Sequence, residues 1–419
     1  MPRKTRNSNN QRGRGKENIP EQLNVDSESE QLNKLKTSKK TTILDVNDDC
    51  LVEIFMHLDG IDILNVAVAH KRFGNALDRV FIRRRLHNPS IVSNSKKQLK
   101  LSLNVLEQFG HLITSVTVFY KLHKFDVLMQ AMVKYCGETI TELHFRQDKD
   151  DSNTDYWKAR QQLLNLSTKF PKLKSLAFQY KKSIDCPYSD AFIQPIPTLT
   201  AFRVYGLIFS HEDALKFITV NGQLELLGLS VPDGYITQSF ITKIDSSLPN
   251  LQTLKLNIVE IEGTVEYPST PPFINLRELF FGSLKTTDTF ATLRKLFGTE
   301  IERFELSVMD YFIANFVENI SQYKKLSVFT LHLSLDINAF LHRFDVSIFS
   351  STTLRELILR NKQLTKLKIY WYGADENFDI YRKKFRDVVN ENLNGARWCM
   401  EEKEYIMQLI VKEISFVKK

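Results

Sequence analysis

The sequence predicts an α/β solenoid, a fold in which short strands and helices alternate along the chain and neighbouring units stack side by side. Three observations lead to this prediction. An apolar residue followed by apolar residues at +3 and +5 recurs ten times from about residue 112 to residue 375. Apolar clusters with helical spacing lie between successive triplets, and a segment of short amphipathic helices precedes the first of them.

The composition is that of an ordinary folded chain. With 419 residues, 42% of them apolar and 25% charged, it can bury a sizeable core. It has no apolar run of the roughly 18 residues that a membrane span needs, and its basic, polar start is unlike a signal peptide. The cysteines Cys50, Cys136, Cys186 and Cys399 lack the spacing of zinc ligands or of a disulfide framework. We therefore expect no membrane contact, no metal and no cofactor, and a reduced compartment, cytoplasmic or nuclear or both.

Residues 1–42 form a polar, basic tail that we expect to be disordered, because it has too few apolar side chains to build a core. Ten Lys or Arg against five Asp or Glu give the tail +5 of the net charge of +8. Its basic cluster suits a nuclear address or a nucleic-acid contact, although such clusters are often only solvated. Because little net charge lies elsewhere, nucleic acid is not the expected partner. Lys16-Glu17-Asn18 resembles the KEN-box degron of the mitotic ubiquitin pathway, but chance explains a tripeptide equally well.

The segment 43–88 predicts a small all-α module. Polar residues before its first helix can cap the N-terminus, and Gly60 permits a turn before a second helix. Such short helices make too small a core to stand alone, so the module should complete its core against a partner or a neighbouring domain. One apolar face of the first helix, with i, i+3, i+4, i+7 spacing, is formed by Leu51, Ile54, Phe55 and Leu58.

The repeating triplets predict the solenoid proper, at 112–375. Apolar residues at +3 and +5 describe a short strand with one buried face, and the cluster that follows describes a helix. One such unit cannot bury its own apolar face, so the units must stack, with right-handed connections. The longest interval holds the polar insertion 147–155, which we place in a loop. The triplets begin at Ile113, Ile140, Leu173, Leu199, Leu224, Leu251, Leu276, Ile301, Leu326 and Leu354.

The two ends of the solenoid are harder to assign. We interpret residues 89–111 as a linker and a cap on the first repeat. Near the other end, Leu364 starts a second triplet only ten residues after Leu354, so one of the two segments belongs to a helix or a return loop. Beyond it, apolar residues at helical spacing predict a helical C-terminal cap over 376–419.

In phase and length the repeats resemble the leucine-rich-repeat family. That family usually places Asn or Cys at +8, where the side chain bonds the backbone of the turn. This sequence lacks that asparagine ladder, so the repeats resemble the divergent type. The +8 positions hold residues such as Lys121, Asp148, Lys181, Leu207, Pro232, Val259 and Met309.

The segment 43–73 resembles an F-box, a motif that the family uses to bind a Skp-family adaptor. One departure is Asn47, which stands where the family commonly has proline. The matching residues are Val46-Asn47-Asp48-Asp49, Leu51, Glu53-Ile54-Phe55, Leu58, Asp62-Ile63-Leu64 and Lys71-Arg72-Phe73.

The resemblance implies that the segment inserts into a Skp-family adaptor and is linked through it to cullin and RING subunits. The alternative is that the same amphipathic helices only cap the end of the solenoid. On the first interpretation, the adaptor-binding residues are Val46, Leu51, Ile54, Phe55, Leu58, Ile63, Leu64 and Phe73.

The substrate surface of such a receptor would be the concave face of the strands, where side chains at +2, +4 and +6 point. Aromatic and Arg residues dominate binding hot spots between proteins, although any single strand residue is more often merely solvated. The mixed charge does not suit a phosphate backbone. The candidate substrate-binding residues are Phe119, Arg146, Arg203, Tyr205, Lys255, Phe280, Arg303 and Arg360.

No catalytic motif is present: the sequence has no phosphate-binding glycine loop, no Gly-x-Ser-x-Gly, no His-Glu-x-x-His and no Cys-x-x-Cys. We therefore expect a non-catalytic substrate receptor of an SCF-type ubiquitin ligase, which holds an unidentified protein substrate. One alternative is a leucine-rich-repeat scaffold that is not assembled into a ligase. Another is a nucleic-acid-associated factor that acts through its basic tail.

Overall fold

A computed structural model describes most of the chain from residue 42 onward. The expected tail, including Lys16, Glu17 and Asn18, lies outside the described residues apart from residue 42. The described residues are 42–84, 86, 89–92, 95–119, 125–147, 161, 163–185, 189–230, 235–257, 260–262, 273–284, 289–308, 316–334, 351–372, 383, 386–387, 398–406 and 410–418.

One long sheet runs through the molecule. Within the described residues it has 13 strands, of which the first eleven are parallel and the last two are antiparallel. A separate parallel pair joins β7 (Tyr235–Thr237) to β9 (Glu260–Glu262). In spatial order the long sheet contains β1 (Ser90–Val92), β2 (Ser115–Phe119), β3 (Glu142–Gln147), β4 (Ser175–Asp185), β5 (Ala201–Ile208), β6 (Leu226–Ser230), β8 (Thr253–Asn257), β10 (Glu278–Leu284), β11 (Arg303–Val308), β12 (Val328–Ser334), β13 (Lys366–Tyr372), β15 (Ile410–Lys418) and β14 (Trp398–Ile406).

Helices connect the parallel strands, as the spacing of the apolar clusters predicted. Three further helices precede the first strand and form the expected N-terminal module. The described helices are α2 (Asp48–Phe55), α3 (Gly60–Ala69), α4 (Gly74–Arg83), α5 (Lys96–Phe109), α6 (Phe125–Cys136), α8 (Leu166–Lys169), α9 (His211–Val220), α10 (Gln238–Ser247), α11 (Thr289–Phe297), α12 (Phe316–Ser321) and α14 (Ser351–Arg360), with short 3-10 turns at η1 (Ile43–Asp45), η2 (Lys71–Phe73), η3 (Gly110–Leu112) and η5 (Ser189–Phe192).

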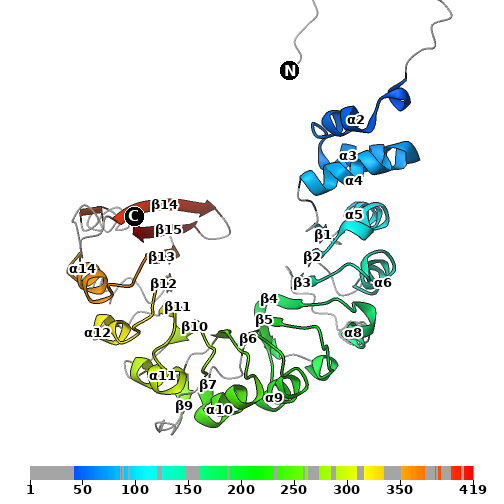
Figure 1. Ribbon diagram of the computed structural model, residues 1–419. Coiled ribbons are helices and arrows are strands. Elements are labelled where there is room, and N and C mark those ends of the chain that lie inside the picture. The colour runs from blue at the N-terminus through cyan, green and yellow to red at the C-terminus, as the bar shows by residue number, and fades with distance from the viewer. Residues whose placement is uncertain are drawn as a thin grey trace, which may run out of the picture.

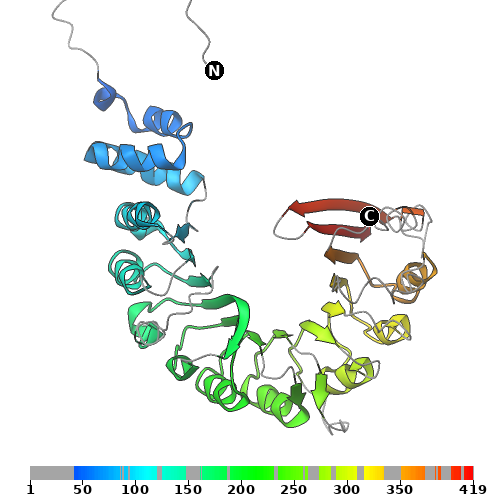
Figure 2. The same ribbon diagram turned by 180° about the vertical axis from the view of Figure 1, so that it is seen from behind.

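The molecule is an open arc with strands on the inside and helices on the outside (Figure 1). The view from behind shows the same arrangement (Figure 2). The helices α2 to α4 stand at one end of the arc and the β14–β15 hairpin stands at the other. The expected stacking of strand–helix units into an α/β solenoid is therefore confirmed.

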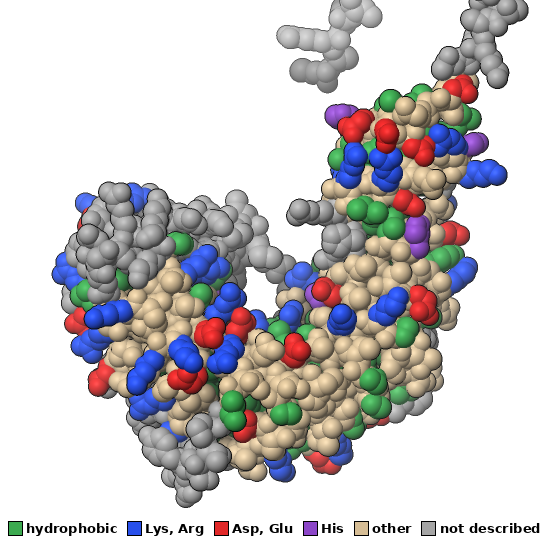
Figure 3. All heavy atoms as spheres, viewed as in Figure 1, with side chains coloured by type: hydrophobic (Ala, Val, Ile, Leu, Met, Phe, Trp, Pro, Cys, Tyr) green, Lys and Arg blue, Asp and Glu red, His purple; other side chains and the backbone are tan. Residues whose placement is uncertain are grey.

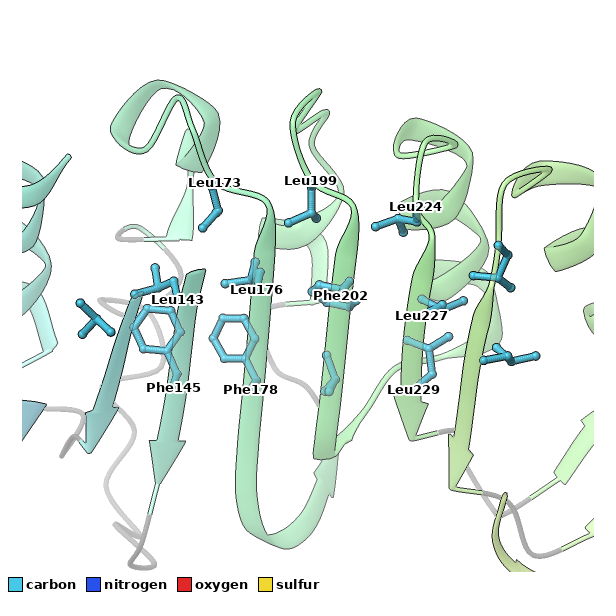
Figure 4. Close-up of a cluster of buried hydrophobic side chains, with 14 of the residues drawn as sticks. Leu143, Phe145, Leu173, Leu176, Phe178, Leu199, Phe202, Leu224, Leu227 and Leu229 are labelled. Atoms are coloured by element: carbon cyan, nitrogen blue, oxygen red, sulfur yellow. The ribbon is translucent and has the colours of Figure 1, made fainter. Parts of the chain in front are cut away.

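The apolar triplets build the core, as their spacing predicted. Leu173, Leu176 and Phe178 of one repeat are all fully buried, and the equivalent residues of neighbouring repeats lie beside them (Figure 4). The strand register explains the alignment, because Leu176 pairs with Leu143 on one side and with Phe202 on the other. Each repeat thus buries its apolar face against the same positions of its neighbours.

Aromatic rings strengthen this stack in the first half of the solenoid. The Phe145 ring lies 5.2 Å from Phe125 and 4.9 Å from Phe178, centroid to centroid. Phe178 in turn meets Phe192 edge-on at 4.8 Å, and Phe192 lies 5.9 Å from Phe202. Such aromatic pairs add to the stabilisation that burial alone supplies.

From β2 to β13, backbone hydrogen bonds join neighbouring repeats at the +1 position of each triplet. The Thr114 carbonyl, for example, accepts hydrogen bonds from the N–H groups of both Thr141 (2.7 Å) and Glu142 (3.1 Å) in the next repeat. Because each of these repeats uses the same two donors, this backbone ladder holds the strands in one register. The carbonyls that accept in this way belong to Thr114, Thr141, Lys174, Thr200, Glu225, Gln252, Arg277, Glu302 and Ser327.

The resembled family uses an asparagine ladder after each strand to bond the backbone of the turn. Here a polar side chain before the triplet bonds the backbone of the neighbouring repeat. Asn221 is fully buried three residues before Leu224. Its Oδ1 accepts from the Ile196 N–H at 2.9 Å, and its Nδ2 donates to the carbonyls of Gln194 and Phe217, both at 3.1 Å. An asparagine side chain therefore does bond the backbone of the neighbouring repeat, but this asparagine lies before the strand rather than after it.

The structure settles the assignments at the two ends of the solenoid. The stretch 89–111 is not a linker, because β1 pairs with β2 and α5 packs behind it, which makes a further repeat. Leu354 lies in α14, and the strand is β13, which starts after Leu364. Within 376–419, where a helical cap was expected, the described residues 383 and 386–387 are helical, but β14 and β15 form an antiparallel hairpin and β15 pairs with β13. An antiparallel hairpin covers the hydrogen-bonding groups that the last parallel strand would otherwise expose.

We predict that replacing Asn221 by alanine lowers the free energy of unfolding by more than about 2 kcal/mol, because the groups it bonds lose buried partners. Urea unfolding followed by far-UV circular dichroism measures this. Asn250→Ala, at an exposed position, is the matched control and should change stability by less than about 0.5 kcal/mol. Equal losses in the two variants would contradict the role of Asn221.

Candidate protein-binding surfaces

The first two helices of the N-terminal module begin where the polar residues of the sequence predicted N-caps. Asn47 caps α2, because its side chain accepts a hydrogen bond from the Cys50 N–H at 2.8 Å. Asp59 caps α3 in the same way by accepting from the Asp62 N–H at 2.7 Å. Asn47 is thus a good N-cap at the position where the resembled family has proline.

Half of the predicted adaptor contacts are core residues of the module itself. Leu51 is 0% exposed, and Phe55, Ile63 and Phe73 are also buried. The Phe55 and Phe73 rings meet edge-on at 5.4 Å. In this structure these four side chains hold the module together and are not exposed to a partner, and their assignment as adaptor contacts stays a prediction.

The apolar side chains that the module does offer to a partner are different ones. Ile54 is 46% exposed, so it points away from the helix face that Leu51 and Phe55 bury. Val46 and Leu58 are partly buried against the core, and the Leu64 side chain lies outside the described residues. Among the described side chains of the module, the large exposed apolar ones are Ile43, Leu44, Ile54 and Ile82.

Ion pairs join the first and third helices of the module. Asp49 pairs with Arg79 at 2.7 Å, and Glu53 pairs with Arg83 at 2.8 Å. Arg72, from the basic part of the motif, pairs with Asp48. Because the Asp49–Arg79 and Glu53–Arg83 pairs are largely solvated, we attribute to them the orientation of α2 and α4 rather than much stability.

The module packs directly against the first repeat of the solenoid. Phe81 of α4 stacks on Phe109 of α5, with ring centroids 4.8 Å apart and planes 14° from parallel. His111 lies 3.1 Å from an Asp78 carboxylate oxygen across the same junction. One continuous apolar core runs from the module into the repeats. The module therefore caps the first repeat while its outer helix surface stays exposed.

The second candidate surface is the inner face of the arc, where the side chains at +2, +4 and +6 lie as predicted. On the N-terminal arm, the Arg146 guanidinium lies over the Phe119 ring, 5.3 Å from its centroid. In the middle, Arg203 lies close to Gly228, where an added Cβ would come within 3.3 Å of the Arg203 Cα. Because Gly228 has no side chain, it leaves room for the aliphatic part of the Arg203 side chain.

Two side-chain atoms of the inner face are buried without a hydrogen-bond partner in the described structure, His144 Nε2 and Arg203 Nε. Burial lowers the pKa of His144 below its ordinary value; Glu142 opposes this shift, and Arg203 and Arg146 add to it. Burial raises the pKa of Tyr205, and Glu305 raises it further although it lies four strands away in the sheet. The curvature thus brings opposite parts of the inner face within electrostatic reach.

The C-terminal arm contains a hollow of about 350 Å³, which we call the basic hollow. It spans strands β8 to β13, and charged side chains of both signs gather over this arm (Figure 3). Lys255 lies over the Phe280 ring at 5.5 Å, and Arg303 pairs with Glu278 at 3.2 Å. The charged residues that line it are Lys255, Glu278, Arg303, Glu305, Lys366 and Lys368.

The predicted substrate residues lie on the inner face with one exception. Arg360 is in α14 on the helical side, where it pairs with Glu356 at 3.6 Å, so its placement on the concave face was wrong. The error follows from choosing Leu354 rather than Leu364 as the start of the last strand. The same choice missed Lys366, Lys368 and Tyr370, which the +2, +4 and +6 rule would have found from Leu364.

No group of three potential metal ligands comes together in the part of the chain that the structure describes. Among the helices described, none is both long and apolar enough to cross a membrane. Cys50 and Cys136 carry free thiols, and burial raises the pKa of Cys136 to about 12. A thiol with so high a pKa is a packing residue rather than a nucleophile.

Comparison with known proteins adds little to these observations. No protein-family model matches the chain, and no curated protein matches it. Among solved structures, the chain is similar to the yeast complex of Rad7 and Elc1, with 12% sequence identity and a TM-score of 0.29 over 81% of this chain and 90% of that chain. So low a TM-score carries no argument about fold or function.

We predict that Phe55→Ala destabilises the module by about 3–5 kcal/mol, because it opens a cavity in a small core. Ile54→Ala, one residue away on the exposed side, should change stability by less than about 0.5 kcal/mol. Hydrogen exchange read by mass spectrometry over residues 48–83 distinguishes the two. Faster exchange in the Ile54 variant than in the Phe55 variant would reverse our assignment of core and surface.

We predict that His144 makes stability fall as the pH falls. The pKa of His144 in the folded state is lower than its unfolded value of 6.5. At pH values between these two pKa values, the unfolded state therefore binds more protons than the folded state. The contribution is complete above the unfolded pKa and is lost as the pH drops toward the folded one. Urea midpoints between about pH 5 and pH 7.5 should fall more steeply for the wild type than for His144→Asn. His57→Asn, at an exposed position, should match the wild type; equal slopes in all three proteins would refute the prediction.

Proposed function

We propose that the chain is a non-catalytic substrate receptor of an SCF-type ubiquitin ligase. In this proposal the outer surface of the N-terminal module docks a Skp-family adaptor, which links it to cullin and RING subunits. The inner face of the solenoid holds a protein substrate. The receptor supplies proximity between the substrate and a bound conjugating enzyme rather than chemistry of its own.

One observation carries the proposal. A segment with the order of F-box residues forms a distinct three-helix module at one end of an open arc. Its outer helix surface carries exposed Ile54 and Ile82, while the inner face of the arc is open at a separate place. Two separate surfaces on one chain are what a receptor needs, because it must hold an adaptor and a substrate at once.

A specific observation also favours the second candidate, a leucine-rich-repeat scaffold with a helical cap. The Phe81–Phe109 stack and the continuous core show that the module covers the end of the first repeat. A cap would need this contact and nothing more. The two functions differ in one respect, because only the receptor requires the exposed face of α2 to bind an adaptor.

We predict that the full-length chain captures a purified Skp-family adaptor and that Ile54→Asp weakens capture by more than about 2 kcal/mol, because it places a charge at an apolar anchor. Ile274→Asp is the matched control, since Ile274 is 80% exposed at a distant loop. Pull-down followed by calorimetric titration measures both variants. No capture by the wild type, or equal loss in both variants, would reject the receptor and leave the scaffold.

A further inference from the structure

We propose that the basic hollow binds an acidic segment of a polypeptide. Its six charged residues are four cations and two carboxylates, which leaves a net charge of +2. Arg303 is paired with Glu278 at 3.2 Å, and Glu305 is paired with His332 at 2.7 Å. The lysines therefore account for the excess of positive charge.

Two of the lysines have no acidic partner in the described part of the chain. Lys255 and Lys366 pair with no carboxylate within the described residues, and both are only partly exposed. Lys255 comes from β8 and Lys366 from β13, at opposite ends of the hollow. Positive charge that is concentrated in a concavity attracts anions more strongly than the same charge on a flat surface.

Aromatic rings lie against two of the lysines, Lys255 and Lys368. The Lys255 ammonium lies over Phe280, and the Lys368 ammonium lies 5.7 Å from the Tyr370 centroid. Between them, His332 stacks on Tyr370 at 4.6 Å and meets Phe280 edge-on at 6.3 Å. Side chains that are already ordered lose less conformational freedom when a ligand binds.

The carboxylates in the hollow decide which kind of anion fits. Nucleic acid carries a charge at every nucleotide and would place phosphates against Glu278 and Glu305. A peptide can instead place uncharged side chains there, and the hydroxyls of Thr253 and Thr330 line the same hollow. Mixed polarity of this kind suits a peptide whose acidic residues alternate with small polar ones.

The dimensions also suit a peptide. Four strand intervals separate β8 from β13, and strands lie about 4.8 Å apart, so the span is at most about 19 Å. An extended peptide of about six residues covers that length. The inference depends on the proposed receptor function only in calling this peptide a part of the substrate, because the binding itself needs no adaptor.

Fluorescence anisotropy with the full-length chain tests the proposal. The probe is a fluorescein-labelled peptide of about twelve residues in which glutamate and serine alternate, and its partner has glutamine in place of glutamate. We expect the glutamate peptide to bind and the glutamine peptide to bind at least about tenfold more weakly. Raising the salt concentration from about 50 mM to about 300 mM should weaken the glutamate peptide severalfold.

The double variant Lys255→Gln, Lys366→Gln should weaken the glutamate peptide by at least about tenfold. The control variant Lys243→Gln, Lys324→Gln removes two exposed lysines outside the hollow and should stay within about twofold of the wild type. Thermal unfolding of both variants verifies that they fold.

No binding of the glutamate peptide, equal binding of the glutamine peptide, or equal loss in the two double variants would overturn the proposal. So would a single-stranded oligonucleotide of the same length that displaces the peptide at a lower concentration than unlabelled peptide does, since that outcome assigns the hollow to nucleic acid. Adaptor capture is measured separately, so failure of the receptor function would leave this result unaffected.

Discussion

The structure depends on the stacking of equivalent apolar positions between neighbouring repeats. No single strand–helix unit could bury its triplet, but Leu176 and Phe178 are fully buried because Leu143, Phe145 and Phe202 lie beside them in register. The backbone ladder at the +1 carbonyls maintains that register through the hydrogen bonds it repeats from β2 to β13. A slip of one residue would turn the apolar side chains of a strand toward the solvent.

Curvature follows from the same stacking and creates the inner face. Helices are about 10 Å wide, whereas parallel strands lie about 4.8 Å apart, so a row of strand–helix units must bend with the strands inside. The bend brings side chains from distant strands together, as the effect of Glu305 on the pKa of Tyr205 shows. It also gathers Lys255 and Lys366 around one hollow although 111 residues separate them in the sequence. The binding properties of the face therefore depend on the arrangement of the repeats as much as on the residues.

In the N-terminal module, the local apolar pattern predicted the helix but not which of its side chains would be buried and which exposed. The spacing correctly predicted a helix over Leu51, Ile54 and Phe55, but α2 ends at Phe55 and Leu58 lies beyond it. The spacing did not separate side chains that the module buries from those it exposes, because α3 and α4 decide which side of α2 is covered. Phe55 faces Phe73 and is buried, whereas Ile54 points outward and is exposed. A partner can reach only the second kind of residue in this conformation.

The sequence by itself determined the repeating strand–helix architecture, the positions of most strands and the existence of the helical module, because each follows from the spacing of apolar residues within one segment. The tertiary structure alone decided between Leu354 and Leu364, since the choice depends on which segment pairs with β12. It also decided that the sheet ends in the β14–β15 hairpin, because the open edge of the last parallel strand takes β15 as its partner. Both decisions depend on contacts between segments far apart in the chain, which local spacing does not encode.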